Sequence, residues 1–462
     1  MSNLNRRKFI KTSSLGAIAA STLSINCQNN LNQSNQGKYL GGFKTNPISN
    51  IKAAFIGLNR GGTHLRNFAS LKNTEVVGLC DIYESTLKRE LERLYQITDN
   101  LKNLKNYWGS KKEWIKMIDE VKPDVVFIST DWKSHTPMIK ECIKKGCHVF
   151  CEVPFSLELN ELWEIINISE KYQKHCMMLE NVNYGRDELM FLNMCRKGVI
   201  GELLHGEAAY IHDLRWQMDH DKTRMGSWRT DFYREKNGNI YPTHGLGPVA
   251  QYMNLCRSDD NFHKIVSYSS PALGRNQYSQ ENLSESNPWK NISFENGDIN
   301  SSIIKTKIGR TILVQWDETS PRPYTRLNLI QGTRGTLAGF PVRVALENGF
   351  EDITKDHHSW IENEDLMRLY EKYDHPLYKK LNKKTVKSGH GGMDGIMMYR
   401  IVECLNNGLP LDQNVYEGCF WSAVAPLSKQ SILDDGKPQE FPDFTRGKWK
   451  SNKPIFGLNK NY

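Results

Sequence analysis

A glycine-containing turn and a later aspartate have the spacing of a nucleotide-binding site. Gly57, Asn59 and Gly62 follow a short apolar run as Gly-x-Asn-x-x-Gly, and Asp81 ends the next apolar run. Such a turn presents backbone N–H groups to a pyrophosphate at a helix N-terminus, and the acidic residue binds ribose hydroxyls. Asp81 would repel a 2′-phosphate, so NAD is favoured over NADP. Asn59 replaces the usual second glycine, and asparagine tolerates the positive φ that such a turn can require.

Further polar segments follow later apolar runs. Thr130-Asp131-Trp132-Lys133-Ser134-His135 follows one run, and Glu152-Val153-Pro154 ends the next. Both stand where the carboxyl edge of a parallel sheet would lie, which is where ligands bind in such sheets. Farther on, His244 follows Tyr241-Pro242-Thr243. Histidine exchanges protons readily near neutral pH, but a single histidine in such a position is more often structural than catalytic.

The elements that carry the first group predict a nucleotide-binding domain. Apolar runs at residues 51–57, 76–81, 124–129 and 148–152 alternate with helical segments, the first of them at residues 63–71. Strand–helix alternation predicts an α/β fold with a doubly wound parallel sheet of the Rossmann type. We place this NAD-binding domain at residues 49–185.

The second half of the chain is strand-rich. Alternating runs at 203–211, 301–308, 311–316 and 326–331 predict an open, mainly antiparallel sheet in an α+β substrate-binding domain, residues 186–462. Segments 245–256, 392–408 and 415–434 have helical patterns, whereas 212–226 and 270–298 are loop-like. The uncovered face of an open sheet is a candidate surface for a homodimer, although the sequence leaves the oligomeric state open.

The N-terminus has the pattern of an export signal. In residues 1–27, Arg6-Arg7 precedes Lys8-Phe9-Ile10-Lys11 and a modest apolar run. This resembles a twin-arginine signal, which the export machinery uses to carry folded proteins, and the run is too short to span a membrane. We expect export to the periplasm or cell envelope. Cys27 is a candidate lipid attachment site behind a poor lipobox, and residues 28–48 read as a flexible tether.

Charge and composition exclude two classes of function. The formal net charge of +9 falls to +5 without Arg6, Arg7, Lys8 and Lys11. That surplus is too small and too scattered to indicate nucleic-acid binding. No group of His, Asp, Glu or Cys has metal-ligand spacing, so we expect no metal site.

Six motifs occur in order and carry a family resemblance. They are Glu180-Asn181-Val182-Asn183-Tyr184, Trp228-Arg229-Thr230, Tyr241-Pro242-Thr243-His244-Gly245, Arg322-Pro323-Tyr324, Gly389-His390-Gly391-Gly392-Met393-Asp394 and Glu440-Phe441-Pro442-Asp443-Phe444. Together they resemble glycoside hydrolase family 109, a branch of the Gfo/Idh/MocA superfamily whose founding activity is α-N-acetylgalactosaminidase. The resemblance runs from about residue 50 to the C-terminus.

The resemblance implies roles position by position. NAD contacts are implied at Arg60, Gly61, Asp81, Trp132, Lys133, Ser134, His135, Glu152, Val153 and Asn181. Carbohydrate contacts are implied at Tyr184, Arg229, Tyr241, Pro242, Thr243, His244 and Tyr324. Of these, we expect His244 and Tyr184 to be catalytic. Lys133 and Ser134 depart from the family pattern, which leaves the cofactor contacts of that loop open.

The implied reaction is hydrolysis with a tightly bound NAD that is regenerated in each turnover. Oxidation at carbon 3 of the sugar would acidify carbon 2, the glycosidic oxygen would leave by elimination, water would add, and the ketone would be reduced again. Related sugar dehydrogenases have Glu-Lys-Pro where this chain has Glu152-Val153-Pro154. Valine cannot carry a proton, so Tyr184 and His244 are the candidates.

Two other functions stay open at this point. One is an exported NAD(P)-dependent sugar oxidoreductase with net hydride transfer, against which Val153 argues. The other is a binding or assembly protein that keeps the dinucleotide only as a structural group. The sequence also leaves the sugar, the anomer and the aglycone undetermined.

Overall fold

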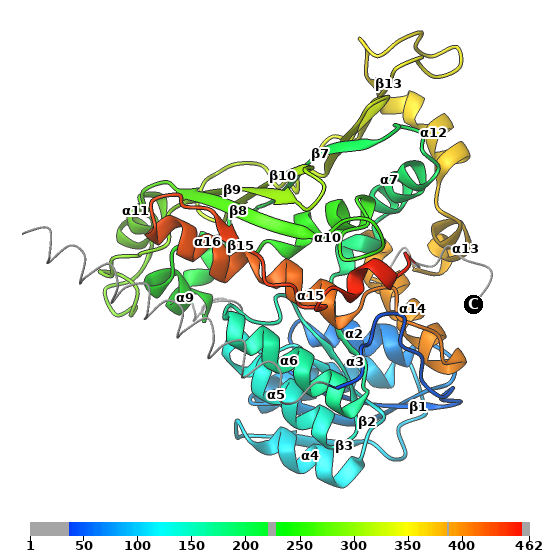
Figure 1. The fold of residues 1–462 in the computed structure, drawn as a ribbon. Helices are drawn as coiled ribbons and strands as arrows, with labels where there is room; N and C mark the ends of the chain where they lie inside the picture. Colours follow the sequence, from blue (N-terminus) through cyan, green and yellow to red (C-terminus); the bar gives the residue numbers. More distant parts are fainter. Residues whose placement is uncertain (1–36, 220–227, 386–387, 455–462) are drawn as a thin grey trace, which may run out of the picture.

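Two β-sheets, each with its own helices, make up the protein (Figure 1). The computed structural model describes residues 37–219, 228–385 and 388–454. The predicted export signal and Cys27 lie outside these residues and stay predictions. Within the described ranges, no helix combines the length and apolar character needed to cross a membrane.

The first sheet is parallel and has the strand order β3-β2-β1-β4-β5-β6. Its strands are β1 (Ile51–Ile56), β2 (Thr74–Asp81), β3 (Lys105–Trp108), β4 (Val125–Ile128), β5 (His148–Cys151) and β6 (Cys176–Met178). The connecting helices are α2 (Gly61–Ala69), α3 (Glu84–Tyr95), α4 (Glu113–Val121), α5 (Trp132–Lys144) and α6 (Leu159–Tyr172). The predicted Rossmann sheet is confirmed. Its two short edge strands, β3 and β6, lack the long apolar run that marks the central strands.

The central strands form a continuous aromatic layer. Phe55, Phe127 and Phe150 lie on the neighbouring strands β1, β4 and β5, and their rings stack at centroid distances of 4.8 and 5.1 Å. Strands buried on both faces need such apolar side chains along their whole length. This layer fixes the positions of the carboxyl ends of β1, β4 and β5 relative to one another.

The second sheet has nine strands in the order β14-β13-β12-β11-β7-β10-β9-β8-β15. They are β7 (Leu203–Ile211), β8 (Phe262–Ser269), β9 (Ile299–Thr306), β10 (Thr311–Asp317), β11 (Leu329–Gly332), β12 (Gly335–Ala338), β13 (Arg343–Leu346), β14 (Ile361–Glu362) and β15 (Gln439–Glu440). All neighbours are antiparallel except β7 and β10, which are parallel. The expected sheet is therefore mixed, because the long excursion from β7 to β10 supplies the crossover that a parallel pair needs.

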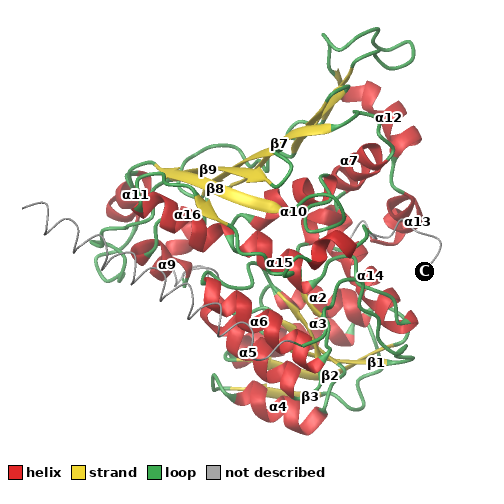
Figure 2. Ribbon diagram, in the orientation of Figure 1, coloured by secondary structure: helices red, strands yellow, loops and turns green. Residues whose placement is uncertain are grey.

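Helices cover one face of the second sheet (Figure 2). The helices of this half are α7 (Arg186–Arg196), α9 (Arg229–Glu235), α10 (Thr243–Tyr252), α11 (Gly274–Asn282), α12 (Leu366–Tyr373), α13 (Pro376–Thr385), α14 (Met393–Asn407), α15 (Val415–Ser422) and α16 (Val424–Leu433). α10 packs on β7 and α16 on β8. Two expectations need correction: the segment 415–434 forms two helices that meet at Ala423, and the polar helix α11 lies within the expected loop 270–298.

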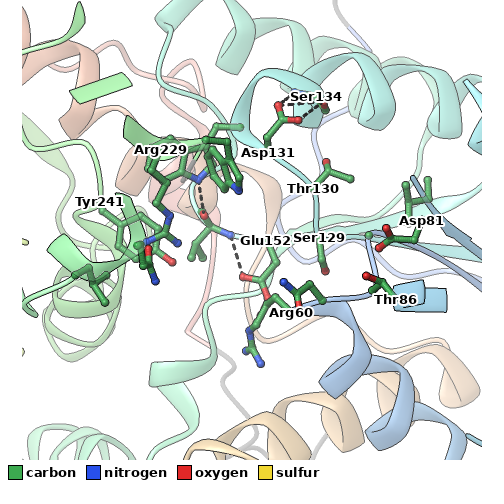
Figure 3. Close-up of a pocket in the computed structure, with 18 of the residues that line it drawn as sticks. Arg60, Asp81, Thr86, Ser129, Thr130, Asp131, Ser134, Glu152, Arg229 and Tyr241 are labelled. Carbon is green, nitrogen blue, oxygen red and sulfur yellow. Dashed lines mark hydrogen bonds and ion pairs between the residues drawn. The ribbon is translucent and has the colours of Figure 1, made fainter. Parts of the chain in front are cut away.

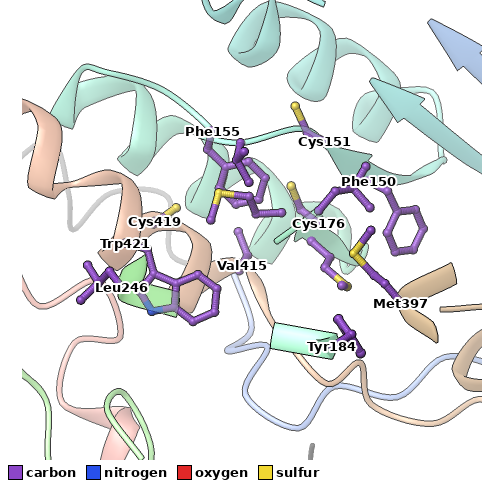
Figure 4. Close-up of a cluster of buried hydrophobic side chains, with 14 of the residues drawn as sticks. Phe150, Cys151, Phe155, Cys176, Tyr184, Leu246, Met397, Val415, Cys419 and Trp421 are labelled. Atoms are coloured by element: carbon purple, nitrogen blue, oxygen red, sulfur yellow. The ribbon is translucent and has the colours of Figure 1, made fainter. Parts of the chain in front are cut away.

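The C-terminal helices return to the first sheet. α14 packs on α2 and β1, and α15 packs on α6 and β6. Figure 4 shows the resulting core, in which Phe150 from β5, Leu246 from α10, Met397 from α14 and Trp421 from α15 belong to one buried cluster. The two halves of the molecule therefore share a core, although the predicted domains are consecutive in sequence.

Residues 37–48 do not form the free tether that their composition predicts. Leu40 is buried, and its backbone N–H donates to the Tyr416 hydroxyl at 3.0 Å. The Tyr39 ring stacks on Tyr416 at a centroid distance of 4.9 Å, and Phe43 packs edge-on against His175 at 4.8 Å. Three apolar residues among polar ones are thus enough to fix this segment on the protein surface.

Candidate active site

One large cavity lies where the carboxyl edge of the first sheet meets the second half of the chain. Its volume is about 1810 Å³, and residues from both halves line it. Figure 3 shows Asp81, Arg60, Ser129 and Glu152 on one side and Arg229 with Tyr241 on the other. Ligand sites of open α/β sheets lie at this edge, and the volume exceeds that of an ordinary small-molecule pocket.

The turn after β1 requires a glycine at its first position. Gly57 has φ +80°, and a Cβ added to it would lie 2.4 Å from the Ser129 carbonyl oxygen. Helix α2 begins at Gly61, so the turn leads directly into a helix N-terminus. Asn59 does not use a positive φ, in contrast to the expectation, because the turn places only Gly57 in that region. This backbone fits the pyrophosphate of a dinucleotide.

The Asp81 carboxylate is fixed at the end of β2. Its Oδ2 accepts a hydrogen bond from the Leu58 N–H at 2.8 Å, and its Oδ1 accepts one from the Tyr83 N–H at 2.9 Å. Thr86 on α3 lies beside it along the cavity (Figure 3). The carboxylate thus stands next to the glycine turn, at the position where ribose hydroxyls bind in this architecture.

Arg60 is held in the turn by two carboxylates. Its Nε lies 3.0 Å from Glu152 Oε1, and its terminal nitrogens lie 2.8 and 3.1 Å from the two oxygens of Asp394. Burial opposes ionisation of Glu152, but Arg60 and the hydrogen bond from His64 outweigh it and lower the pKa of Glu152 to about 2. Burial also favours loss of the Arg60 proton, yet Glu152 and Asp394 raise the pKa of Arg60 above its usual range.

Asp394 gathers several residues of the cavity around one buried carboxylate. Besides Arg60, it accepts from Asn181 Nδ2 at 2.8 Å and lies 2.7 Å from His390 Nδ1. Despite its burial, the bonds to His390 and Arg60 lower the pKa of Asp394. The buried Oδ1 of Asn181 has no hydrogen-bond partner among the described residues, and Asn181 lines the cavity. Its free acceptor fits a ligand N–H group, such as the carboxamide of a nicotinamide.

The segments after β4 and β5 meet at the middle of the cavity. Trp132 Nε1 donates to the Val153 carbonyl oxygen at 3.2 Å, and both residues line the cavity. Ser134 also lines it, with its N–H and hydroxyl bonded to Asp131. His135 is buried between the carbonyl oxygens of Pro154 and Thr130, at 2.9 and 3.2 Å, and therefore supports the turns from behind.

His244 and His390 both line the cavity with a carboxylate at Nδ1, and His244 is the one that lies among the aromatic rings of the second half. It lies in the first turn of α10 and lines the cavity. Its Nδ1 lies 2.7 Å from Oε1 of the fully buried Glu180, which also accepts from the Val182 N–H at 3.1 Å. A carboxylate at Nδ1 fixes the ring and its tautomer, and this arrangement is the one that a general acid or base requires.

Tyrosines and an arginine surround this imidazole. The rings of Tyr210 and Tyr241 lie 5.4 and 5.1 Å from that of His244, and Tyr324 lies 6.2 Å from Tyr210. Figure 3 shows Arg229 beside Tyr241. The Arg229 guanidinium stands 4.8 Å from the Tyr241 ring centre, and Glu318 Oε1 lies 3.8 Å from its Nη1. Burial opposes the charge of Arg229, but Tyr241 and Glu318 raise its pKa. Aromatic faces and fixed donors of this kind suit a sugar ring.

Tyr184 is not brought to the cavity, and its predicted role in the site needs correction. It is buried in the core cluster of Figure 4, and its hydroxyl lies 3.4 Å from Asp412 Oδ2. Burial raises its pKa well above the ordinary range, so a phenolate does not form there near neutral pH. Tyr210, which the sequence did not single out, lines the cavity beside His244 together with Tyr241.

Four other predicted contact residues stand behind the cavity rather than on its wall. Gly61 is buried against Ser129, and the Lys133 ammonium lies 5.2 Å from the Phe232 ring centre. Pro242 and Thr243 form the start of α10, where Thr243 is fully buried. The remaining predicted residues line the cavity, namely Arg60, Asp81, Trp132, Ser134, Glu152, Val153, Asn181, Arg229, Tyr241, His244 and Tyr324.

Sequence reasoning assigned no role to Glu180, Asp394 or Tyr210. Glu180 and Asp394 lie inside motifs that carry the family resemblance, and their place in these motifs is the one sequence signal that could have identified them. Nothing in the spacing indicates that Glu180 faces His244 or that Asp394 faces Arg60, because 64 and 334 residues separate these partners. Only the packing of α10 and α14 on the first half brings them together.

Comparison with known proteins gives the two halves separate matches. Residues 51–180 match the description "Oxidoreductase family, NAD-binding Rossmann fold". Residues 184–451 match "Glycosyl hydrolase 109, C-terminal domain". The first half is thus an NAD-binding Rossmann domain, as its turn and aspartate predict.

Relatives match along nearly the whole chain. Glycosyl hydrolase family 109 protein 1 of Akkermansia muciniphila is 52% identical over 423 residues, covering 90% of this chain and 86% of that protein. A glycosyl hydrolase family 109 protein of Shewanella baltica is 44% identical, covering 98% of this chain and 99% of its own.

Solved structures share the fold at low identity. Levoglucosan dehydrogenase in complex with NADH and levoglucosan superposes with a TM-score of 0.66 at 15% identity, over 85% of this chain and all of that one. An NAD-binding oxidoreductase from Klebsiella pneumoniae gives 0.64 at 16% identity, over 85% of this chain and 99% of the other. The long matches to family 109 proteins decide the assignment, and this chain belongs to glycoside hydrolase family 109.

Proposed function

We propose that this family 109 hydrolase is an exported enzyme that releases terminal, α-linked N-acetylgalactosamine from a carbohydrate. The observation that carries the proposal is the His244–Glu180 pair. It stands beside Arg229 and Tyr241 in the same cavity as the dinucleotide turn. A proton-transfer group, a buried cation and sugar-binding aromatic rings therefore border one space with the cofactor site.

The cofactor and the protein would divide the chemistry. When bound, NAD supplies reversible hydride transfer at carbon 3 of the sugar. His244 then exchanges protons at the reacting hydroxyl or at carbon 2, and help of this kind is worth about 10²–10⁴ in rate. Arg229 stabilises negative charge that develops on a substrate oxygen, since a buried guanidinium stays protonated. With the pKa of Glu152 at about 2, its carboxylate remains ionised and keeps Arg60 in the turn.

Val153 separates this proposal from a sugar oxidoreductase. It lines the cavity at the position where related dehydrogenases have a lysine. Among the described residues that line the cavity, the one lysine is Lys111, which follows the edge strand β3 on the Asp81 side of the sheet. No described lysine therefore stands beside Val153 to carry the proton of an oxidised hydroxyl.

A panel of nitrophenyl glycosides tests the proposal. The purified protein is incubated with α- and β-linked N-acetylgalactosamine, galactose and N-acetylglucosamine derivatives, and both nitrophenol release and NADH absorbance are followed. We expect release from the α-linked N-acetylgalactosamine derivative without accumulation of NADH, and a loss of at least 10²-fold in His244→Ala with the bound NAD retained. Accumulation of NADH without nitrophenol would instead establish an oxidoreductase, and an unchanged rate in His244→Ala would exclude the assigned site.

Export is part of the proposal and rests on the N-terminal sequence. If Arg6 and Arg7 direct the twin-arginine pathway, changing both to lysine leaves the protein in the cytoplasm while the wild type reaches the periplasm or cell envelope. Cell fractionation measures this directly. Equal distribution of the two proteins would exclude the route, and a mass shift on Cys27 would identify lipid attachment.

A further inference from the structure

Among the tryptophans that line the cavity, two lie on segments of the second half that have not been described so far. Trp216 lies on the 3-10 helix η2 (Arg215–Met218), and Trp289 lies in the segment after α11. Trp216 is 47% exposed. A large aromatic ring that stays open to water on a cavity wall gains free energy when a ligand covers it. Trp216 is not part of the buried core cluster, so its ring is available to a ligand in the cavity.

The segments that carry both tryptophans adjoin the sugar end of the cavity. The Leu214 N–H, two residues before Trp216, donates to the Glu318 carbonyl at 3.1 Å, and Glu318 is the partner of Arg229. On α11, the Arg275 guanidinium stacks 3.7 Å from the ring centre of Tyr233, whose hydroxyl donates to Glu318. η2 and α11 therefore both adjoin the residue that holds Arg229. Asp81 marks the adenosine end, on the first sheet.

The wall that carries the two rings is fixed before any ligand binds. Arg215 pairs with Asp213 at 2.8 Å and stacks 5.3 Å from the Tyr278 ring centre on α11. The Ser279 hydroxyl, also on α11, donates to the carbonyl oxygens of Trp289 and Lys290. Helix α11 thus contacts both the 3-10 helix that carries Trp216 and the segment that carries Trp289. A surface that is formed before the ligand arrives loses little entropy on binding.

We propose that Trp216 and Trp289 form a subsite for the sugar ring on the leaving-group side of the cleaved bond. This rests on the proposed function and assigns to Trp216 and Trp289 the selectivity for the sugar on the leaving-group side. The apolar face of a pyranose packs on an indole ring, and the neighbouring Gln217, which also lines the cavity, can bond its hydroxyl groups.

The test compares two substrates in the holoenzyme. One is methyl α-N-acetylgalactosaminide, and the other is a disaccharide with α-N-acetylgalactosamine linked to galactose. Trp216→Ala is the decisive variant, because its exposed ring can be removed without opening the core. We expect the ratio of kcat/KM for the disaccharide to kcat/KM for the methyl glycoside to fall about tenfold, which corresponds to about 1.4 kcal/mol.

Trp360→Ala is the matched control. Trp360 is 42% exposed, lies 4.9 Å from the Arg343 guanidinium and does not line the cavity, so its removal should leave the ratio unchanged. An unchanged ratio in Trp216→Ala, with both substrates cleaved, would overturn the subsite but not the glycosidase. Cleavage of neither substrate by the wild type would overturn both. Loss of bound NAD in Trp289→Ala would place that ring against the adenosine and also overturn the subsite.

Discussion

Replacing Glu180 by glutamine tests the assignment of the proton-transfer group most directly. Glu180 is fully buried, and its Oε1 lies 2.7 Å from His244 Nδ1. Glutamine keeps the shape and an acceptor oxygen but removes the negative charge. When His244 takes up a proton during turnover, the positive ring would then lack the buried counter-charge beside its Nδ1.

The size of the effect follows from the kind of bond that is lost. A hydrogen bond to a charged group contributes about 1.5–3 kcal/mol. If that bond strengthens only as His244 is protonated, the loss falls on the transition state and lowers kcat by about 10- to 150-fold. Steady-state rates across the pH range with the best substrate of the glycoside panel measure this, and the pH profile should change together with kcat.

A double-mutant cycle separates positioning from general destabilisation. In the His244→Ala background, Glu180→Gln should cost little more, because the two residues act as a unit. Glu170→Gln is the control: Glu170 is also a buried glutamate, paired with Arg446 away from the cavity, and its removal should lower the melting temperature without altering the pH profile. A wild-type rate in Glu180→Gln, or equal losses with and without His244, would refute the reasoning.

Four further outcomes are expected. Asp394→Asn should release NAD at least about tenfold faster than the wild type, which is measured as the nucleotide left after dialysis. Glu403→Gln on the same helix is the control and should retain NAD. Equal retention by the two variants would contradict the role of Asp394. Gly57→Ala should lose NAD, because its Cβ would meet Ser129 at 2.4 Å, while Gly309→Ala, also at positive φ but with open space, should keep it. The lowered pKa of Glu152 stabilises the fold above pH about 4.5, and this contribution is lost as the pH falls toward 2. Between these pH values, the melting temperature of Glu152→Gln should therefore fall less than that of the wild type. If the open sheet face pairs two copies, Ile303→Glu, at a position 55% exposed, should give monomers by light scattering; an unchanged mass would exclude that face.

The sequence predicts the fold wherever local pattern decides the structure. The apolar run 51–57 with its terminal glycine, and the run that ends at Asp81, form adjacent parallel strands because buried strands need such residues. The glycine turn is readable because Gly57 alone tolerates its conformation and its contact with Ser129. α11 escapes recognition because its residues are mostly polar, and packing rather than local pattern fixes it.

The sugar end of the site is predictable only where the family motifs mark it. His244 and Arg229 line the cavity, but Tyr184, in an equally well matched motif, faces the core. A motif records which residues belong together and not which side of the backbone each one occupies. The partners Glu180 and Asp394 depend on contacts between distant segments, and no local periodicity encodes such contacts.

The position of Asp394 in the chain has a consequence for biosynthesis. Arg60 emerges from the ribosome early, but the carboxylate that holds it lies 334 residues later, on α14. A nascent chain can form the parallel sheet long before then, yet its dinucleotide pocket stays incomplete until α14 has emerged and packed on α2. Lasting capture of NAD should therefore begin only once α14 is in place, and truncation before α14 should leave a domain that binds the nucleotide only transiently.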